Sequence, residues 1–578
     1  SHLVDLAAKG RSWWDGKQIC AEGLKESLTQ GLTQSAGNKE LQAATEGQLS
    51  IPSDTQLEQW AALSSQLMGF PRHLSQHVGG FVIARYSLHD LVPTENASMA
   101  ERSVIQWDKD DIDALGLLKV DVLALGMLSA IAHALVFVGQ KQHPDKPLGA
   151  RPMAMQDIPA EDHATYAMIT AADTLGVFQI ESRAQMSMLP RLKPQCFYDL
   201  VIEVAIVRPG PIQGGMVHPY LRRRQGLEPV DYPSPSVKQA LERTLGVPIF
   251  QEQVMQLAIL AAGFTAGEAD QLRRAMAAWR HRGSLGPFQE KLVDGMLSRG
   301  YSRDFAERVF AQIQGFGEYG FPESHAASFA LLVYVSCWLK CHHPDAFLAA
   351  LLKAQPMGFY APAQLVRDAR AHGVVVHPVD VKTSQVFASL EPIDDQWAVR
   401  LGLHQVAHLT QEAMHRIVQA RTAGKFRSVD DLAGRAELSR QDLQALAAAG
   451  ALQSLGNDRH QAHWLATGHD RLPGVLQDTA CEQELPAASL LPVPTEAQNL
   501  VADYASLGLS LGRHPLALLR KELKERFQSR PAIELQELGH QQLARASGLV
   551  THRQRPGTAK GVVFITLEDE TGSINLII

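Results

Sequence analysis

A helical pattern runs from about residue 160 to residue 352, and short strand-like segments flank it on both sides. Strand-like and loop segments dominate from about 60 to 130, and short strand-like runs return between 372 and 402. One hydrophobic core cannot serve a chain of 578 residues, so we expect about three to five domains. The sequence therefore predicts a multidomain α+β protein with one large helical region.

Composition argues against a membrane or secreted protein. With 45% hydrophobic and 20% charged residues, the chain resembles an ordinary soluble protein. No apolar run is long enough for a membrane-spanning helix, so we expect no membrane contact. The start, Ser1-His2-Leu3, lacks an initiator Met and a signal pattern and looks like a cut end. Five scattered cysteines, an odd number, indicate reduced thiols and a cytoplasmic location.

Charge is unevenly distributed along the chain. The net charge is −7, yet residues 181–224 contain seven Lys or Arg and three acidic residues, a local charge of +4. A positive face on an acidic body is compatible with DNA binding, because only the contacting face must release counterions. Lys193 lies in this segment and is a candidate DNA contact.

A candidate metal ligand lies in the strand expected over residues 116–123. Three apolar residues share one face of this strand, whereas Lys119 and Asp121 share the other. A carboxylate held on a rigid strand suits Mg²⁺, which prefers oxygen ligands and keeps room for substrate phosphates. A neighbouring Lys can balance charge or meet a triphosphate. The pattern by itself favours a simpler interpretation, a solvated Lys–Asp pair on an edge strand.

Residues 106–126, QWDKDDIDALGLLKVDVLALG, resemble the palm motif of bacterial DNA polymerase III α subunits, which are C-family DNA polymerases. Together with GFPRHLSQHVGGFVI at residues 69–83, they are similar to the error-prone branch of that family. The resemblance implies that Asp121 is one of three catalytic carboxylates of a two-metal Mg²⁺ site, with Lys119 near the nucleotide. It further implies DNA contacts, which are Arg72, Ser75 and His77. The acids just before the strand are expected on a solvated helix face.

Further segments resemble the helical fingers of the same family. They are residues 174–182, 205–211, 248–255 with 272–276, and 317–327. A capping box from Thr265 to Glu268 starts a helix that carries Arg273 and Arg274, whose planar forks suit phosphate oxygens. Without the resemblance, these arginines would be interpreted as a solvated cationic face. The resemblance makes them triphosphate ligands and adds three nucleotide contacts, which are Arg208, Tyr319 and His325.

Two cysteines and two histidines lie close together in the following helix. Cys337 and Cys341 are four residues apart, and His342 and His343 come next, a pattern that could bind zinc. Core-type apolar residues surround them, however, and free cysteine is commonly buried. The pattern therefore favours a buried helix.

The C-terminal third resembles DNA-binding modules of the family. Residues 403–421 and 438–455 look like a tandem helix-hairpin-helix, which offers hairpin N–H groups and a helix N-terminus to phosphate. His408 stands where the family prefers Gly in the first hairpin, and this puts phosphate binding there in doubt. Residues 546–578 resemble the first strands of an OB-fold. Its loop contributes candidate contacts to a single strand, which are Arg553, Arg555 and Lys560.

The predicted architecture is a Pol β-like palm portion with a thumb remnant, large helical fingers, a tandem helix-hairpin-helix and a partial OB-fold barrel. The boundaries expected are 1–60 for a thumb or palm-proximal region, 61–150 for the palm portion, 151–380 for the fingers, 381–470 for the tandem helix-hairpin-helix, 471–540 for a linker and helical connection, and 541–578 for the partial OB-fold.

The family takes two of its three catalytic carboxylates from a P-D-x-D-x-D segment, and no such segment occurs in these 578 residues. One aspartate cannot hold two ions about 3.5–4 Å apart. We therefore expect this chain alone to be inactive and its longer parent to polymerise DNA.

The leading functional hypothesis is error-prone, damage-tolerant (translesion) DNA synthesis by two-metal nucleotidyl transfer. The alternatives are a non-catalytic, polymerase-derived DNA-binding scaffold and the replicative DNA polymerase III α subunit. The expected partners are primer–template DNA, a deoxynucleoside triphosphate, and the sliding clamp, reached through a Y-family-like companion protein of the mutagenesis complex.

Overall fold

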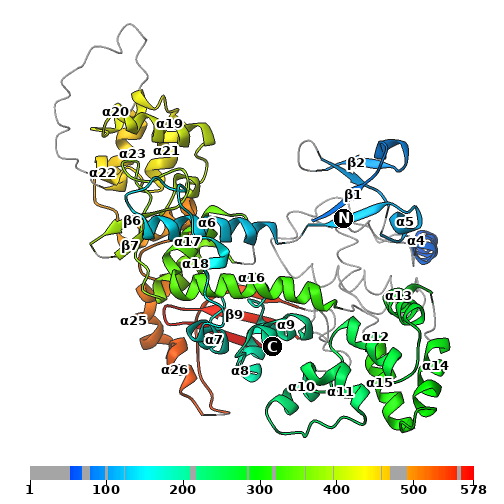
Figure 1. The fold of residues 1–578 in the computed structure, drawn as a ribbon. Helices are drawn as coiled ribbons and strands as arrows, with labels where there is room; N and C mark the ends of the chain where they lie inside the picture. The colour runs from blue at the N-terminus through cyan, green and yellow to red at the C-terminus, as the bar shows by residue number, and fades with distance from the viewer. Residues whose placement is uncertain are drawn as a thin grey trace. The chain divides into compact units, whose positions relative to one another are not determined.

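The computed structural model describes residues 53–67, 79–97, 102–107, 109–122, 124–207, 217–282, 286–315, 321–357, 360–394, 396–456, 458–468, 491–539, 541–555 and 562–578. The chain divides into two compact units, Ser1–Leu123 and Ala124–Ile578. Element labels are those of Figure 1. Among the described residues, no helix is both long and apolar enough to cross a membrane.

The first unit combines short strands with two helices in its described part. These elements are α4 (Asp54–Leu67), β1 (Gly80–Ile83), the 3-10 turn η1 (Leu88–Asp90), β2 (Thr94–Asn96), β3 (Ser103–Ile105), α5 (Lys109–Ala114) and β4 (Leu118–Asp121). Strand β1 pairs with β4 and strand β2 with β3, both antiparallel. The predicted strands are confirmed, but the expectation was wrong for residues 60–67, which are helical. Buried Leu57 and Ala61, four residues apart, give α4 its packed face.

The β1–β4 ribbon determines how the predicted metal-binding strand is presented. Gly80 lies opposite Asp121, and Val82 lies opposite Lys119. Since side chains alternate along a strand, Lys119 and Asp121 belong to one face and the apolar residues to the other, as predicted. The apolar face consists of exposed residues in two cross-strand pairs, Phe81 with Val120 and Ile83 with Leu118.

The second unit begins with a long run of helices, which confirms the helical prediction for the described part of residues 160–352. They are α6 (Leu125–Gln142), η2 (Met155–Asp157), α7 (His163–Thr170), α8 (Arg183–Leu192), α9 (Phe197–Ile206), α10 (Val217–Arg224), α11 (Pro235–Leu241), η3 (Glu242–Thr244), α12 (Gln251–Leu260), α13 (Ala266–Arg282), α14 (Gly286–Leu297), α15 (Arg303–Gly315), α16 (Glu323–His342), α17 (Pro344–Lys353) and α18 (Pro362–Ala371). Side-chain caps on their first turns, such as Asp162 on α7 and Ser234 on α11, accept from backbone N–H groups that have no partner within the helix.

Helix α16 packs against two hydrophobic cores. Most of its buried residues up to Cys337 contribute to a core with α7 to α15, whereas Val335, Trp338 and Leu339 contribute to a second core with α6 and α17. Figure 1 shows α16 as the long green helix between these groups. A helix buried on several faces needs apolar residues all round, and its residues 333–339 are all buried.

A small mixed sheet and a second group of helices follow. They are β5 (Val376–His377), β6 (Ser389–Ile393), β7 (Gln396–Arg400), η4 (Leu403–Gln405), α19 (Gln411–Thr422), α20 (Val429–Arg435), α21 (Arg440–Ala448), α22 (Gln453–Gly456) and α23 (Arg459–Gly468). The central strand β7 pairs in parallel with β5 and antiparallel with β6. These helices share the core of α6 and α17.

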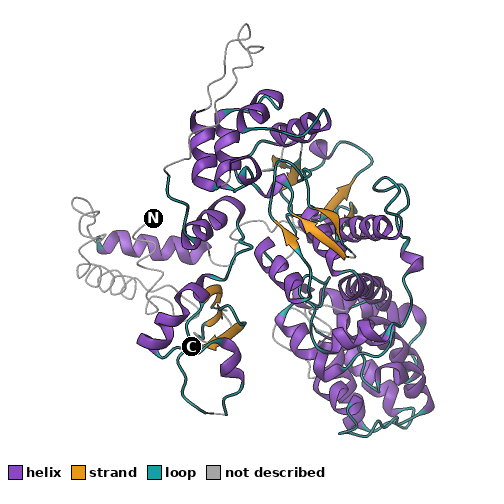
Figure 2. Ribbon diagram, turned by 90° about the vertical axis from the view of Figure 1, so that its left-hand side faces the viewer, coloured by secondary structure: helices purple, strands orange, loops and turns teal. Residues whose placement is uncertain are grey.

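The C-terminal part holds three helices and a three-stranded sheet. They are α24 (Glu496–Leu507), α25 (Pro515–Phe527), α26 (Ala532–Gln536), β8 (Leu549–Gln554), β9 (Phe564–Glu568) and β10 (Ser573–Ile577). The strands form an antiparallel meander in the order β8-β9-β10, at the positions where the sequence predicts strands. Figure 2 shows this small sheet among helices.

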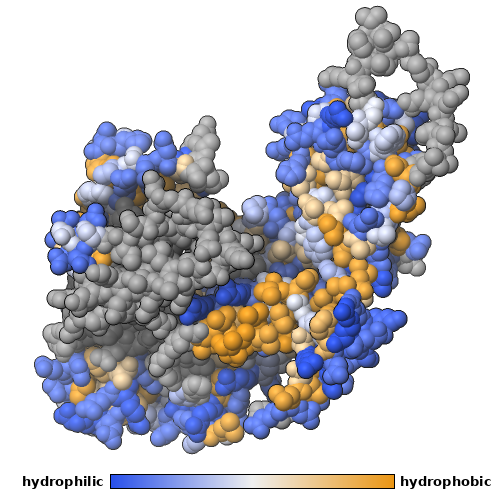
Figure 3. All heavy atoms as spheres, turned by 180° about the vertical axis from the view of Figure 1, so that it is seen from behind, coloured by the Kyte–Doolittle hydropathy of each residue, from blue (hydrophilic) through white to orange (hydrophobic). Residues whose placement is uncertain are grey.

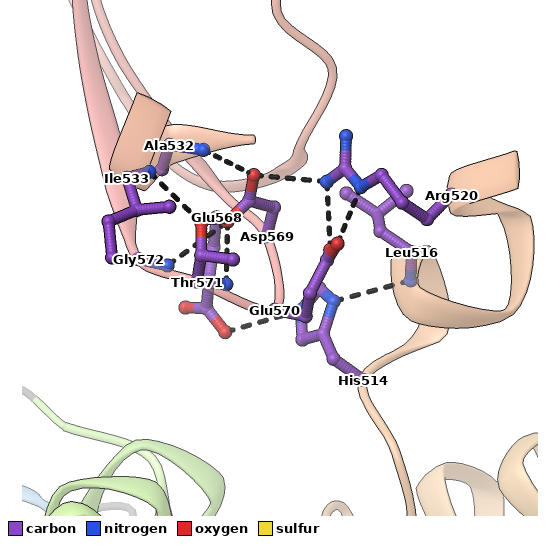
Figure 4. Close-up of polar contacts among 10 residues, drawn as sticks. All are labelled: His514, Leu516, Arg520, Ala532, Ile533, Glu568, Asp569, Glu570, Thr571 and Gly572. Carbon is purple, nitrogen blue, oxygen red and sulfur yellow. Dashed lines mark hydrogen bonds and ion pairs between the residues drawn. The ribbon is translucent and has the colours of Figure 1, made fainter. Parts of the chain in front are cut away.

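Asp569 fastens the turn between β9 and β10 to the helices. Its carboxylate accepts hydrogen bonds from the backbone N–H groups of Ala532 and Gly572 and from Thr571, and it forms an ion pair with Arg520 at 3.1 Å (Figure 4). Glu570 adds a second ion pair with Arg520. These contacts hold α25, α26 and the sheet together. Val550 of β8 and Ile577 of β10 are exposed apolar residues. Figure 3 shows a patch of hydrophobic residues on the back of the molecule.

The fold is thus α+β, rich in helix, with four small sheets among the described residues.

Candidate functional site

Strand β4 carries the residues predicted to bind metal and nucleotide. The backbone of Asp121 ends this strand, and the next residue, Val122, donates its N–H to the carbonyl of Gly79 at 2.7 Å. Lys119 is exposed on the same face of the strand. The side chain of Asp121 lies outside the described part of the structure. The local geometry therefore consists of a paired strand that presents Lys119 and the Asp121 position on one face.

Six predicted contacts lie outside the described residues. They are Arg72, Ser75, His77, Arg208, Tyr319 and Lys560. These assignments stay predictions.

The two arginines predicted to bind triphosphate meet at one carboxylate. Arg273 donates from Nε and Nη2 to Asp270 Oδ1 at 3.0 and 2.9 Å, and Arg274 Nη2 lies 2.8 Å from Asp270 Oδ2. The predicted capping box is confirmed, since Thr265 and Glu268 each accept the other's backbone N–H. Hydrogen bonds from Arg273, and then from Arg274, lower the pKa of Asp270. Helix α13 therefore presents two oriented guanidinium groups, and the carboxylate of Asp270 neutralises one of their two positive charges.

His325 lies on the first turns of α16 between two aromatic rings. Its ring centroid is 5.2 Å from that of Phe321 and 4.3 Å from that of Phe329. Phe329 in turn packs edge-on against Phe178 at 5.1 Å. The ring of His325 is therefore held in a defined position rather than free in solvent.

Some arginines of the predicted positive segment form ion pairs within the chain, and the expectation of a DNA-binding face there stays a prediction. Arg224 donates two hydrogen bonds of 2.6 Å to Asp199, and Arg223 pairs with Glu228 at 3.1 Å. Asp199 is one of the three acidic residues of segment 181–224, but only the fold brings its carboxylate next to Arg224. Lys193 is exposed and ends α8 in a left-handed conformation.

The helix with Cys337 and Cys341 is a core helix, in agreement with the simpler interpretation. Cys337 is fully buried, and burial raises the pKa of its thiol. His342 pairs instead with Asp162 at 2.8 Å. Neither cysteine belongs to a group of metal-binding geometry among the described residues.

One group that could hold a metal does occur among the described residues, and sequence reasoning missed it. It consists of Asp173, Asp368 and His372. The ammonium of Lys340 lies 2.9 Å from Asp173 and 2.9 Å from Asp368, and this side chain is 2% exposed. A buried ammonium already supplies the positive charge that the carboxylates need. The group is therefore a charge network that joins α16 to α18.

The first hairpin of the helix-hairpin-helix adopts a glycine-like conformation at His408, whose φ is 65°. Ala407 donates its N–H to the carbonyl of Ser506 in α24 at 2.8 Å. Thr410 donates its N–H and its hydroxyl to the buried Asp442 carboxylate at 3.3 and 3.0 Å. These hairpin donors are therefore used within the chain.

The C-terminal candidates lie on an open strand. Every residue of β8 is exposed, and Arg553 is one of them, opposite Ile565 of β9. Arg555 follows directly and is also exposed. Both are accessible to an anionic partner.

Known protein families match three separate parts of the chain. Family models match residues 17–124 (bacterial DNA polymerase III alpha NTPase domain), 127–300 (bacterial DNA polymerase III alpha subunit finger domain) and 373–462 (helix-hairpin-helix motif). The whole chain is 58% identical over 576 residues to a protein of Alkalilimnicola ehrlichii named error-prone DNA polymerase.

The chain belongs to the bacterial DNA polymerase III α-subunit family, in its error-prone branch. Proteins with the same name from Bordetella bronchiseptica and Burkholderia pseudomallei are 57% and 55% identical across the whole chain. The chain spans about half the length of these error-prone polymerases, 53% and 52% for the first two organisms. The family assignment confirms the resemblance and does not support the replicative alternative.

Proposed function

We propose that the protein containing this chain is an error-prone, DNA-directed DNA polymerase that acts in damage-tolerant synthesis. The supporting observation is the agreement between similarity over the whole chain and the local geometry of β4, which pairs with β1 and carries Lys119 and Asp121 on one face. In this proposal β1 and β4 belong to the palm, and β8–β10 begin an OB-fold.

The residues have distinct roles in this proposal. Asp121 is a Mg²⁺ ligand, and the ions stabilise the charge that develops on the attacking and leaving oxygens. Lys119 and the forked donors of Arg273 and Arg274 bind the triphosphate. His325 contacts the rest of the nucleotide. Lys193, Arg553 and Arg555 neutralise DNA phosphates.

The carboxylate of Asp121 suits Mg²⁺ binding, but a two-metal site needs more than one carboxylate. Asp121 supplies one hard oxygen ligand, as Mg²⁺ prefers. Among the described residues the only three-membered candidate group is the one that Lys340 neutralises. The remaining ligands of a two-metal site are therefore assigned to other residues of the full-length protein.

The decisive experiment is primer extension by the full-length protein with Asp121→Ala. Extension should fall by at least about a thousandfold, because the metal site is lost, while binding to primer–template DNA persists. The matched control is Asp111→Ala, which removes an exposed acid from α5, the helix just before β4. This variant should retain activity. Unchanged extension by the Asp121 variant would exclude this role.

A second experiment tests the arginine pair. Arg274→Ala should raise the KM for deoxynucleoside triphosphate about tenfold, because one charge-assisted phosphate contact is lost. Arg303→Ala removes a comparably exposed arginine, paired with Glu307 in α15, and serves as the control. Equal KM values for the two variants would remove α13 from the nucleotide site.

A further inference from the structure

Four elements of the second unit meet at Glu323, the first residue of α16. The hydroxyl of Tyr198 in α9 and Nη1 of Arg243 in η3 both donate to Oε1 of Glu323, each at 2.9 Å. The backbone N–H of Glu323 donates to the carboxylate of Glu252 in α12 at 3.0 Å. The start of α16 is therefore fixed by contacts from segments 71 to 125 residues away.

The three side chains also fix one another. The guanidinium carbon of Arg243 lies 3.8 Å from the ring centroid of Tyr198, within the range of a cation–π contact. Burial, followed by the bond to Glu323, raises the pKa of the Tyr198 hydroxyl, so it stays protonated and donates. A planar guanidinium that both stacks and donates has little freedom to rotate.

This cluster lies two residues before His325. The carbonyl of Phe321 accepts the N–H of Gln251 at 3.2 Å, so α12 holds the chain on the other side of Glu323 as well. Phe321 is also one of the two rings that flank His325. The position of the His325 ring therefore depends on where Glu323 is anchored.

Charge at this helix end favours one part of a nucleotide over another. Glu323 and Glu252 place two carboxylates at the N-terminus of α16, against one guanidinium from Arg243. Such an end repels phosphate, although a helix N-terminus otherwise attracts anions. His325 is thus suited to the base or sugar of a nucleotide, whereas phosphates belong with the arginines of α13.

We propose that Tyr198, Arg243 and Glu323 are positioning residues that hold His325 against the base–sugar part of the incoming deoxynucleotide. This inference rests on the proposed polymerase function. Because the Arg243 side chain is 66% exposed, its ion pair adds little to overall stability. Loss of the cluster should therefore change nucleotide binding more than folding.

The test measures primer extension by the full-length protein with Glu323→Gln, Tyr198→Phe and Arg243→Lys. Glu323→Gln should raise the KM for deoxynucleoside triphosphate about tenfold, as for the loss of one charge-assisted hydrogen bond, with kcat within about twofold. Tyr198→Phe keeps the stacked ring and should raise KM less. Arg243→Lys keeps the charge without the planar stack and should be intermediate.

The matched control is Glu242→Gln, because Glu242 precedes Arg243 and pairs with Lys238 rather than with α16. Melting temperatures of all variants should match the wild type. If wild-type protein extends primers and the KM values of the three variants equal that of Glu242→Gln, the positioning role is wrong. If wild-type protein extends no primer, the proposed function itself fails. If only melting temperature changes, the cluster is structural and the inference is also overturned.

Discussion

The Nζ atom of Lys340 lies 2.9 Å from Oδ1 of Asp173, although the Lys340 side chain is almost wholly removed from water. A second carboxylate, that of Asp368, lies at the same distance from the ammonium, and the carbonyl of Leu175 accepts a third contact at 3.1 Å. A buried cation is tolerated only when its donors are satisfied in this way. The contacts connect α16 with α18 and with the loop after α7.

Lys340→Met should therefore destabilise the protein strongly. The change leaves two carboxylates without their common partner, a loss of about 3–5 kcal/mol in the free energy of unfolding for a broken buried pair. Urea denaturation measures it. Lys238→Met, which removes an exposed lysine, should change stability by less than about 1 kcal/mol. Equal effects of the two substitutions would show that the network contributes no stability.

The same network should make stability depend on pH. Burial alone would lower the pKa of His372, but bonds to the carbonyl of Asp368 and to Asp173 raise it above its usual 6.5. The stabilisation from protonated His372 is therefore complete below pH 6.5 and is lost as pH rises through the raised pKa. The melting temperature should fall between pH 6 and pH 8, and His372→Gln should flatten that slope. His415→Gln, an exposed histidine of α19, should leave the slope unchanged.

Glu203 should act in the opposite sense to a stabilising carboxylate. It is fully buried in α9, neither carboxylate oxygen has a partner in the described part of the chain, and burial raises its pKa to about 8. A folded pKa above the ordinary 4.5 means that stability is lost as pH rises from 4.5 to about 8.

Glu203→Gln should consequently stabilise the protein at pH 8 by at least about 1 kcal/mol, with a smaller gain at pH 5. Thermal denaturation at the two pH values tests this expectation. Glu412→Gln, a change at an exposed position of α19, is the control. A destabilised Glu203→Gln at pH 8 would mean that the carboxylate has a role as an anion.

His408→Gly should stabilise the first hairpin without improving DNA binding. A left-handed residue other than glycine costs about 1 kcal/mol, which glycine avoids at some entropic cost in the unfolded chain. The hairpin donors of Ala407 and Thr410 already bind Ser506 and Asp442, so phosphate gains no new partner. Denaturation and DNA-binding titrations at fixed salt test both parts. A clear rise in DNA affinity would mean that the hairpin releases these contacts.

Local pattern was sufficient for the elements whose stabilising groups are close in sequence. The strand at Lys119 and Asp121, the capping box at Thr265 and the strands from residue 549 onward all formed where they were predicted. The first strand follows from alternating side chains, the capped helix from a cap three residues away, and the C-terminal strands from a short turn. The pairing of Arg273 and Arg274 with Asp270 has the same local character and could have been predicted from its i,i+3 and i,i+4 spacing.

The sequence by itself determined the family, the helical middle region and the residue types of the candidate site. Only the tertiary structure decided that Arg224 is neutralised by Asp199, that Lys340 fills the one metal-like cluster described, and that Glu323 is held by Tyr198 and Arg243. The physical reason is that the free energy of a charge depends on its burial and on its nearest opposite charge. Only packing brings together partners that lie up to 167 residues apart in the sequence. The sequence pattern does not contain the distances between such residues.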